Sequence, residues 1–534
     1  MIKSVIVLGA GSAGLLAALS LKRKLPHLTV RVVRSLDLGV IGVGEGTTPT
    51  FPAHLFQFLG LNRRQFYEMA EPVWKLGIRF LWGPRERFDY TFTHHLNAQW
   101  NDLPRPTGYY CDEEYRGCDF VSACMAQDKV FGRQQMGGAP EIHEWHGYHI
   151  ENRKLVDVLE KLSREAGVEF TDGKVSGAER GPQGIAAILL EDGRRLEGDL
   201  FVDASGFRSE LLGRALEEPF ISYDRSLFCD RAVVGGWERT NEPILPYTTA
   251  ETMEAGWSWQ IEHEHFVNRG YVFSSQAISD DQAVAEFQRR NPKVPASPRV
   301  VKFRSGRYRR MWVDNVVAVG NAGGFVEPLE ATALMIICLE CQALVSFLTH
   351  FAYQSTPTSR QLFNDKMNGL WDDVRDFLAL HYRVNTRLDT PFWRHCREDT
   401  DVSNLERLLE FYRENGPSGF ARELLQARET SFGIEGYLVM LVGNRVPYSA
   451  VHRATPAERQ AWERHRARFA AQGAAAMDVR EALAWVRHPN WRWNDEARPA
   501  AAPPVMTPAV QGMGPIGQIG LMGPMPGGMA RAGG

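Results

Sequence analysis

The chain has 534 residues, 44% of them apolar, and its 61 lysine and arginine residues nearly balance 64 acidic residues, for a net charge of −3. This composition predicts a globular protein and gives no sign of a nucleic-acid partner. We find no apolar run of membrane-span length and no pattern typical of a secretory signal, and we therefore expect a cytoplasmic protein without a membrane partner.

The first strand-like run passes through a glycine turn into a helix. The stretch "SVIVLGAGSAGLLAALSLKRKL" is typical of a strand followed by a helix, and "LTVRVVRS" of a second strand. Gly9, Gly11 and Gly14 form G-x-G-x-x-G in this context. The first glycine permits the tight turn, the second lets the backbone approach a pyrophosphate, and the third lets helix and strand pack closely. We therefore predict a dinucleotide site whose phosphates face the amides of the helix.

The end of the second strand departs from the usual dinucleotide fingerprint. An acidic residue normally binds a ribose hydroxyl there, but this chain has Arg34 and Ser35. Arg34 could instead bind the 2′-phosphate of NADP, or Asp37 could bind the ribose. The sequence leaves these alternatives open.

Residues 51–145 are rich in aromatics, look irregular, and contain an unusual lysine. Lys75 lies inside the largely apolar stretch "EPVWKLGIRFLWG". Because an isolated buried charge is costly, either the amine reaches water at the end of a packed stem, or it faces a cavity where it has a chemical role. In the second case burial should lower the pKa of the amine.

The rest of the chain alternates between the two patterns. "ENRKLVDVLEKLSREAG" predicts an amphipathic helix, and "VEFTDGKVSG" and "AAILLEDGRRLEGDLFVDASG" predict strands, with mostly β structure to about residue 310. "DNVVAVGNAGGFVEPLEATALMIICLECQALVSFLTHF" predicts a strand, a glycine turn and a long helix. Residues 355–495 are mostly helical in pattern, and the Pro, Gly and Met-rich stretch from about 499 predicts disorder.

Two later turns distinguish FAD from a nicotinamide cofactor. Asp203 and Gly206 follow one strand, and Gly320 and Asn321 follow another. A simple dehydrogenase would complete its site in the first half of the chain, so we predict an α/β fold with a discontinuous, Rossmann-like FAD-binding domain of the flavin monooxygenase type. The predicted parts are an FAD-binding domain of 1–50, 146–215 and 300–352, an aromatic-rich and β-rich substrate and tunnel region of 51–145 and 216–299, a helical C-terminal substrate region of 353–498, and a disordered tail of 499–534.

Cysteine and histidine give little support for a metal. The seven cysteines are odd in number and match no zinc spacing. Cys338 and Cys341 lie in an apolar helical run and are expected in the core. His263 and His265 could face one side of a strand as metal ligands, but no third ligand is evident. We favour a polar strand face there and predict no metal.

The motifs taken together resemble the flavin-dependent tryptophan halogenase family. The resemblance extends from Met1 to about Trp493 and leaves out the tail. Lys75 falls at the family's catalytic lysine, and Glu330 falls at its active-site glutamate. The stretches that carry the resemblance are "GAGSAG", "IGVGEGTTP", "VWKLGIRF", "HGYHIENRKLVDVL", "DLFVDASGFRSELL", "GWSWQI", "VVAVGNAGGFVEPLEAT" and "LHYRVNTRLDTPFW".

The resemblance implies a reaction. Reduced FAD would react with O2 to give a flavin C4a-hydroperoxide, which oxidises chloride or bromide to hypohalous acid. The acid would pass through an internal tunnel to Lys75, which directs the halogen to an electron-rich aromatic substrate such as an indole, tryptophan or a phenol. Glu330 would orient the oxidant or accept the ring proton. A separate flavin reductase would supply FADH2, and a homodimer is compatible with the sequence.

The resemblance also assigns residues to the cofactor and the halide. The halide would lie against the amides of Thr332 and Ala333, although the family usually has Gly at the second position. Trp257 and Trp259 match paired tryptophans that keep organic substrate from the flavin, and the family's following Pro is Glu262 here. The implied cofactor residues are Gly9, Gly11, Ser12, Ala13, Gly14, Gly44, Glu45, Val175, Asp203, Gly206, Gly320, Asn321, Pro328 and Leu334.

Two other functions remain as alternatives. A flavin-dependent aromatic monooxygenase of the same fold would use the activated flavin directly and would not need Lys75. A flavin-binding carrier or sensor would bind reduced flavin without altering any arene. The departures at Glu262 and Ala333 make free tryptophan no better a substrate candidate than other indoles or electron-rich arenes. The substrate slot could include Phe88, Tyr90, His94, His95, Trp100, Tyr437, Trp462, Trp485, Trp491 or Trp493, although packing is the preferred role for each.

Overall fold

The computed structural model divides by its contacts into two units, Met1–Trp491 and Arg492–Gly534. The predicted disordered tail, Cys111, His94, His95 and Trp100 lie outside the described residues, and everything below concerns the first unit. The described residues are 1–37, 39, 44–93, 117–135, 137–295, 298–425, 431–449 and 452–493.

The sheet that contains the first strand of the chain is mainly parallel and has the order β10-β2-β1-β14-β23-β22. Strand β1 pairs in parallel with β2 and β14, and only the β22–β23 pair is antiparallel. Its β-branched and apolar residues, among them Ile6, Val33 and Phe201, are buried in one core. The strands are β1 (Ser4–Leu8), β2 (Thr29–Arg34), β10 (Glu169–Asp172), β14 (Leu200–Asp203), β22 (Trp312–Val313) and β23 (Val316–Ala318).

Helix α1 (Ser12–Lys24) packs on strands β1, β2 and β14 of this sheet, and helices α6 (Asn152–Glu165) and α8 (Ala333–His350) pack on α1. The sequence predicts all three helices: α1 follows the glycine turn at Gly9, α8 follows the turn at Gly320, and α6 is the predicted amphipathic stretch. The predicted α/β fold is therefore confirmed, with its parallel sheet drawn from segments far apart in the sequence. A small antiparallel sheet of β11 (Val175–Gly181), β12 (Gly184–Leu190) and β13 (Arg195–Glu197) borders it.

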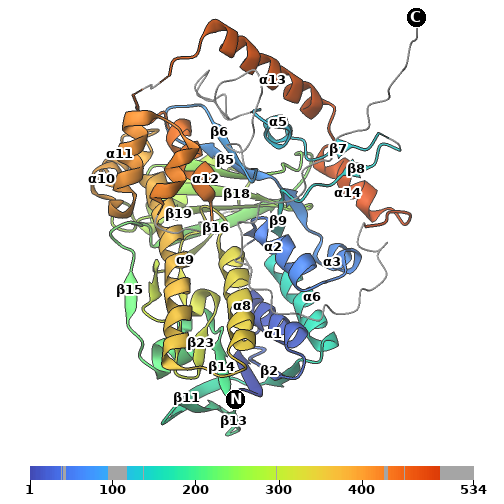
Figure 1. The fold of residues 1–534 in the computed structure, drawn as a ribbon, viewed down its shortest axis with the longest axis vertical. Coiled ribbons are helices and arrows are strands. Elements are labelled where there is room, and N and C mark those ends of the chain that lie inside the picture. The colour runs from blue at the N-terminus through green and yellow to red at the C-terminus, as the bar shows by residue number, and fades with distance from the viewer. Residues whose placement is uncertain are drawn as a thin grey trace, which may run out of the picture. The chain divides into compact units, whose positions relative to one another are not determined.

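Helix α8 is long and apolar enough to cross a membrane by length and composition, which differs from the expectation of no such run. Most of its residues, including Cys338 and Cys341, are buried inside the protein. A core helix of this kind passes the same test, so the helix is weak evidence for a membrane span. Figure 1 shows α8 beside α9, where the two helices extend from β14 and β23 towards β16 and β19.

A second, seven-stranded sheet has the order β20-β16-β19-β18-β17-β5-β6. It joins strands from distant parts of the chain, because β17 pairs in parallel with β5. Helix α7 (Asp280–Arg290) packs on β16 and β19; the predicted "mostly β" stretch to about 310 missed it, although Ser279 and Gln282 form a capping box at its start. The strands are β5 (Gly77–Leu81), β6 (Phe88–Thr91), β16 (Arg231–Glu238), β17 (Thr248–Met253), β18 (Gly256–Glu262), β19 (Phe266–Phe273) and β20 (Arg299–Lys302).

The expectation that residues 51–145 are irregular is wrong for the described part. A short sheet of order β3-β9-β4 joins Glu45–Gly46, Gly147–Ile150 and Val73–Lys75. Both faces of these strands are buried, so apolar and polar residues do not alternate along them, and the sequence did not reveal them as strands. The remaining elements here are α2 (Thr50–Pro52), a π-helical turn (Ala53–Phe58), α3 (Arg63–Ala70), α5 (Phe120–Ala126), β7 (Gly132–Arg133) and β8 (Pro140–Glu141).

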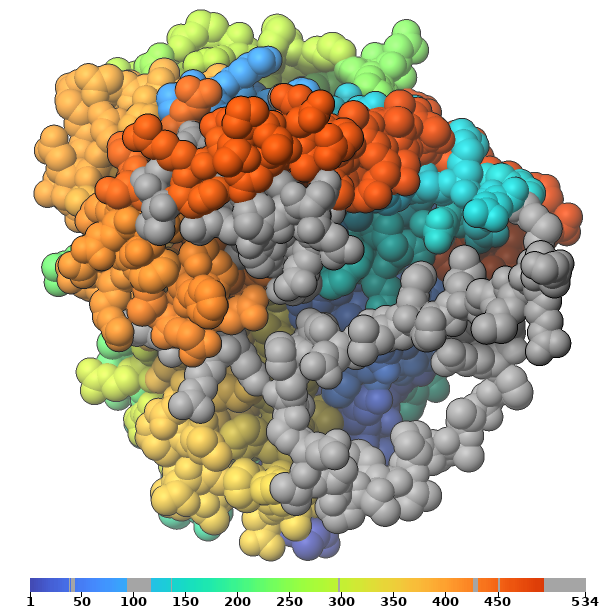
Figure 2. Space-filling model, turned by 45° about the horizontal axis from the view of Figure 1, so that its top comes forward, coloured from blue at the N-terminus to red at the C-terminus, as the bar shows by residue number. Residues whose placement is uncertain are grey.

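The C-terminal part is helical, as predicted. Thr356 and Thr455 each cap a helix through a capping box and precede a proline at its first turn. Helix α13 packs on α5, and Figure 2 shows it beside the cyan segment that contains α5. The helices are α9 (Pro357–Val384), α10 (Pro391–Asp399), α11 (Glu406–Asn415), α12 (Gly433–Gly443), α13 (Pro456–Ala474) and α14 (Val479–Arg487). Further short elements are β15 (Phe220–Ser222), β21 (Gly306–Tyr308) and β24 (Gly324–Phe325).

Candidate active site

The first glycine turn has the geometry that a bound pyrophosphate requires. Gly9 has φ +111°, and a methyl carbon added to it would lie 2.3 Å from the Ala204 carbonyl oxygen. A methyl carbon on Gly14 would lie 2.0 Å from the Gly9 carbonyl oxygen, so turn and helix are in direct contact. By contrast, a methyl carbon on Gly11 would meet nothing within 4 Å, and no side chain caps α1. The helix amides therefore face open space at Gly11, which fits the phosphates of a dinucleotide.

The three predicted cofactor turns lie against one another. Ala204 touches Gly9, and methyl carbons on Ala13 and Gly320 would lie 2.9 Å apart. The Ser209 hydroxyl donates to the Ala322 carbonyl at 2.8 Å, which joins the second turn to the third. The structure thus brings together turns that are more than 300 residues apart, from Gly9 to Gly320, as expected of one nucleotide site.

Asp203 has its carboxylate fully engaged inside the second turn. It accepts hydrogen bonds from the amides of Ser205, Leu211 and Leu212 at 2.8–3.1 Å and from the Ser205 hydroxyl at 2.6 Å. Its role toward a cofactor is therefore to shape the turn. The amide of Gly320, which has φ +63°, donates to the buried Glu340 carboxylate at 2.7 Å in the same manner.

Arg34 is not available for a 2′-phosphate. Its guanidinium pairs with Glu160 at 2.5 Å and with Asp172 at 2.7 Å. Glu160 lies in helix α6 and Asp172 in strand β10, so the arginine holds both elements to β2. The NADP alternative loses its one supporting residue.

Lys75 is fully buried at the end of β4, and no described group forms a hydrogen bond with its Nζ. The nearest aromatic ring is Phe92, whose centroid lies 5.3 Å from Nζ. Burial lowers the pKa of Lys75 to about 7, and the attraction of Glu330 opposes part of this fall. The alternative in which the amine reaches water is therefore wrong. A partly neutral, unpaired amine is held inside the protein, where it can act as a nucleophile or a hydrogen-bond donor.

Glu330 is buried and forms a close pair with a histidine. Its Oε1 lies 2.7 Å from Nε2 of His381, and Nδ1 of His381 donates to the Phe377 carbonyl oxygen at 2.7 Å. Because a carbonyl only accepts, the Nδ1 proton is fixed there. A hydrogen bond at Nε2 then requires one further proton, held by either the imidazole or the carboxyl group. Glu330 and His381 therefore share a proton.

The segment between Glu330 and α8 is strained and uncapped. Ala331 has φ +55°, a left-handed conformation that costs a non-glycine residue on the order of 1–3 kcal/mol. This kink lies before α8, which begins at Ala333, so Glu330 is outside the helix. Within the described residues, the amides of Thr332 and Ala333 donate to no protein group, and no side chain caps the helix. Amides of this kind at a helix N-terminus can accept an anion, and the halide position at Thr332 and Ala333 stays a prediction.

The paired tryptophans lie on β18 and are tied to this segment. Their ring centroids are 6.1 Å apart and both side chains are buried. Trp257 Nε1 donates at 2.8 Å to Glu327, whose same oxygen accepts from Tyr382 at 2.6 Å, and Trp259 Nε1 donates to Asn268 at 2.8 Å. The other oxygen of Glu327 has no hydrogen-bond partner in the described part of the chain, and burial raises the pKa of this carboxyl to about 7.

The remaining predicted cofactor residues lie around these turns or on the elements that flank them. Gly44 is packed against the ring of buried His263, since a methyl carbon on it would lie 2.2 Å from Nε2. His265 is exposed, so the two histidines do not share an environment as a ligand pair would. Burial raises the pKa of Glu45 to about 7. Ser12 donates to Asn152 at 2.8 Å. The others are Val175 in β11, Pro328 before the kink, Asn321 in the third turn and Leu334 in α8.

Sequence reasoning missed several residues of this site. His381 lies in "LHYRVNTRLDTPFW" and Glu327 in "VVAVGNAGGFVEPLEAT", both of which are motifs that carried the resemblance. The sequence therefore shows that these two residues lie in the motifs, but it does not show which residues they contact. Of the proposed substrate aromatics, Tyr90 and Tyr437 are buried and donate to the Phe432 carbonyl and to Asp373, which favours the packing role assigned to them.

Comparison with known proteins identifies the class. The family model described as tryptophan halogenase matches residues 4–459, and the chain belongs to that family. The tryptophan 7-halogenase KtzQ of Kutzneria sp. is 32% identical over 78% of this chain and 82% of its own. The tryptophan 7-halogenase RebH of Lentzea aerocolonigenes is 30% identical over 77% and 82%.

Solved structures agree. MibH, a lanthipeptide tryptophan 5-halogenase, is 38% identical and covers 91% of this chain and 93% of its own, with a TM-score of 0.82. BrvH, a flavin-dependent halogenase from Brevundimonas, is 29% identical over 91% and 99%, with a TM-score of 0.79. The protein is thus a flavin-dependent halogenase, of a family that acts on tryptophan-like substrates and uses a separate flavin reductase, and the hydroxylase alternative is not favoured.

Proposed function

We propose that this enzyme uses FADH2, O2 and chloride or bromide to halogenate an indole ring, with Lys75 and Glu330 as its catalytic residues. The observation that carries the proposal is the buried, unpaired amine of Lys75. Leaving such a group without a partner costs about 1–3 kcal/mol of stability, and a binding partner supplied during turnover would account for its retention.

The glycine turns at Gly9, Gly206 and Gly320 would hold FAD, with its pyrophosphate at Gly11. When bound and reduced, the flavin supplies the two-electron oxidation of halide by O2 that yields hypohalous acid. The amides of Thr332 and Ala333 hold the halide as an anion before oxidation. Trp257 and Trp259 keep the arene away from the flavin, so that the oxidising equivalent passes to halide.

Lys75 then controls the oxidant. The neutral amine accepts the halogen from HO–X, forming an N–X bond and releasing water, or the ammonium donates a hydrogen bond to the oxygen of HO–X. In the first case the ring carbon takes the halogen from nitrogen, and the nitrogen takes up a proton to become the amine again. In the second case the O–X bond breaks, and the ammonium proton converts the departing hydroxide to water. The ring carbon then loses a proton. Glu330 accepts this proton, and His381 holds the carboxyl group in place through the shared proton.

The substrate we propose is an indole carried by a peptide. The higher identity to MibH, at 38%, than to the curated free-tryptophan enzymes KtzQ and RebH, at 32% and 30%, supports a peptide substrate. The departures at Glu262 and Ala333 from the pattern expected of free-tryptophan enzymes support it as well.

Reconstitution with FAD, a flavin reductase, NADH and each halide tests the proposal. Free tryptophan, an N-acylated tryptophan amide and a tryptophan-containing peptide are compared by mass spectrometry. We expect a mass gain of one halogen minus one hydrogen, with kcat/KM at least about tenfold higher for the peptide, the gain expected from one added buried contact. Hydroxylated products would refute halogenation, and a preference for free tryptophan would refute only the substrate assignment.

A further inference from the structure

Lys75 shares one face of a short sheet with three other positions, Gly46, Val73 and His149. Gly46 pairs with His149, and His149 pairs with Val73, across the sheet β3-β9-β4. Lys75 is two residues beyond Val73 and therefore on the same face. Thr248, from β17 of the larger sheet, meets this face, because its Oγ1 lies 2.8 Å from His149 Nε2.

A small space lies between these groups. A methyl carbon added to Gly46 would lie 3.5 Å from Lys75 Nζ, 3.6 Å from Thr248 Oγ1 and 3.2 Å from Ala331 Cβ. Its nearest neighbours would thus be an amine and a hydroxyl at contact distance and a methyl group slightly closer than contact distance. The space is therefore slightly smaller than a methyl carbon and is lined by two polar atoms.

Proton counting fixes the direction of the hydroxyl. The backbone N–H of Glu262 donates to His149 Nδ1 at 3.3 Å, so that nitrogen carries no proton. The proton of the neutral imidazole is then on Nε2 and is donated to Thr248 Oγ1. Burial, and after it the electrostatic effect of Lys75, hold the pKa of His149 well below its usual range, so the imidazole stays neutral.

The hydroxyl of Thr248 is therefore an acceptor toward His149, and its own proton is free. Among the described residues it has no other hydrogen-bond partner. Thr248 is buried, like Lys75. Two buried polar groups thus present donors to the same small space, and neither has a protein acceptor.

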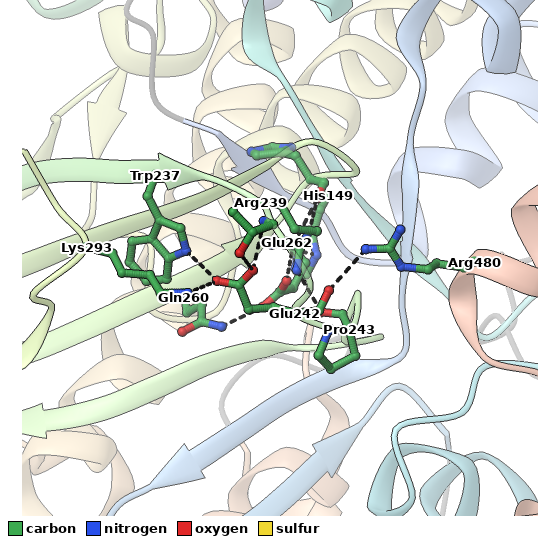
Figure 3. Close-up of polar contacts among 11 residues, drawn as sticks. His149, Trp237, Arg239, Glu242, Pro243, Gln260, Glu262, Lys293 and Arg480 are labelled. Carbon is green, nitrogen blue, oxygen red and sulfur yellow. Dashed lines mark hydrogen bonds and ion pairs between the residues drawn. The ribbon is translucent and has the colours of Figure 1, made fainter.

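The donor that orders this arrangement is a feature of this chain. The halogenase pattern has proline where this chain has Glu262, and proline has no N–H to donate. The Glu262 carboxylate is itself held by Arg239 and by Gln260, as Figure 3 shows, together with the contact to His149. The buried ion pair of Glu262 with Arg239 holds the C-terminal end of β18 next to the His149 imidazole.

We propose that Thr248 is a second oxidant-binding residue, which donates a hydrogen bond to the oxygen of hypohalous acid in the space at Gly46 beside Lys75. His149 and the amide of Glu262 are positioning residues, because they act only through Thr248. This inference rests on the proposed function. Its consequence is retention: the oxidant held by two donors reacts with the arene rather than escaping.

Retention of the oxidant is measured by how the halogen divides between the arene substrate and a chemical trap for free hypohalous acid. The reconstituted enzyme receives bromide, substrate and a 1,3-diketone that consumes free hypobromous acid. Thr248→Val removes the hydroxyl, and we expect the ratio of halogenated arene to trapped bromine to fall about tenfold, the effect of one neutral hydrogen bond. Thr248→Ser restores the ratio. Thr252→Val serves as the matched control, since it deletes a buried hydroxyl of the same strand that donates to the Leu81 carbonyl, and it leaves the ratio unchanged.

A second series tests the positioning. Glu262→Ala keeps the N–H and Glu262→Pro removes it, while both lose the pair with Arg239. We expect only the proline variant to lower the ratio and to move the ¹⁵N signals of His149 away from the Nε2-protonated tautomer. Gly46→Ala, whose methyl carbon would lie 3.2–3.6 Å from its neighbours, should fold normally and lower the ratio.

The outcomes are separable. An unchanged ratio in Thr248→Val, with wild-type halogenation intact, overturns the second oxidant-binding residue alone. A wild-type protein that yields neither product nor trapped bromine overturns the proposed function and this inference with it. A His149 tautomer protonated on Nδ1 overturns the positioning role whatever the activity.

Discussion

Lys75→Met should make the protein more stable while removing its activity. Methionine has nearly the length and volume of the lysine stem, so the surrounding packing is retained. The variant replaces a fully buried amine that has no hydrogen-bond partner. A lysine retained for stability would show the opposite change, so the direction alone distinguishes the two interpretations.

The pKa of Lys75 gives the magnitude. In the unfolded chain the amine keeps its proton up to pH 10.5, whereas burial lowers the pKa to about 7 in the folded state. Between these values the unfolded state binds more protons, so the free energy of unfolding rises with pH. At pH 7 the amine costs the fold about 4 kcal/mol, and at pH 9 about 2 kcal/mol. Lys75→Met removes this cost.

Urea unfolding of the flavin-free proteins, followed by tryptophan fluorescence at pH 7 and pH 9, measures the difference. We expect the variant to unfold at higher urea than the wild type, with a gap that narrows as pH rises. Lys75→Arg provides a control in which a charge is retained in the same place and the fold is destabilised. A variant less stable than the wild type, or a gap independent of pH, would refute the burial argument.

Four further predictions follow from the site. Single-turnover halogenation should increase with pH through about 7 if neutral Lys75 receives the halogen, and a pH-independent rate would contradict this. Glu330→Gln should keep the fold but lower kcat roughly 100-fold, the usual effect of losing a general base; an unchanged kcat would exclude Glu330 as proton acceptor. Ala333→Gly should shift product ratios in equimolar chloride and bromide, and identical ratios would dissociate this position from halide choice. Gly11→Val should raise the FAD Kd at least about tenfold at unchanged melting temperature, whereas Gly14→Ala should lower the melting temperature, because only the latter meets a backbone atom; equal effects would disprove the assigned roles.

Local patterns predicted the elements that bind the nucleotide. The strand, glycine turn and helix at Gly9, the helix that starts at Asn152 and the long helix after Gly320 each depend on residues close in sequence. Their mutual placement was predictable too, since parallel strands bring their carboxyl ends to one edge of a sheet. For that reason the contacts of Gly9 with Ala204 and of Ala13 with Gly320 agree with the expectation.

The residues 51–93 and the helix α7 were not predicted. The strands at Val73–Lys75 and Gly77–Leu81 are buried on both faces, which removes the alternation that reveals a strand. Helix α7 is short and charged, so its apolar period is weak, although its capping box was present in the sequence.

The environment of Lys75 depends on contacts that no local pattern encodes. Gly46, Thr248 and Ala331 come from three distant segments and meet at the amine only in the folded chain. Glu330 lay at a recognisable position, but the left-handed Ala331 that separates it from α8 could not be predicted, because alanine rarely adopts this conformation.

One measurement tests the role of the buried amine most directly. Wild-type enzyme and Lys75→Met, both loaded with FAD and supplied with reductase, NADH and bromide, are given an indole substrate in the presence of a hypobromous acid trap. The wild type should give brominated indole, and the variant should give only trapped bromine at an undiminished total. Brominated indole from Lys75→Met, formed while the trap is in excess, would contradict the assignment.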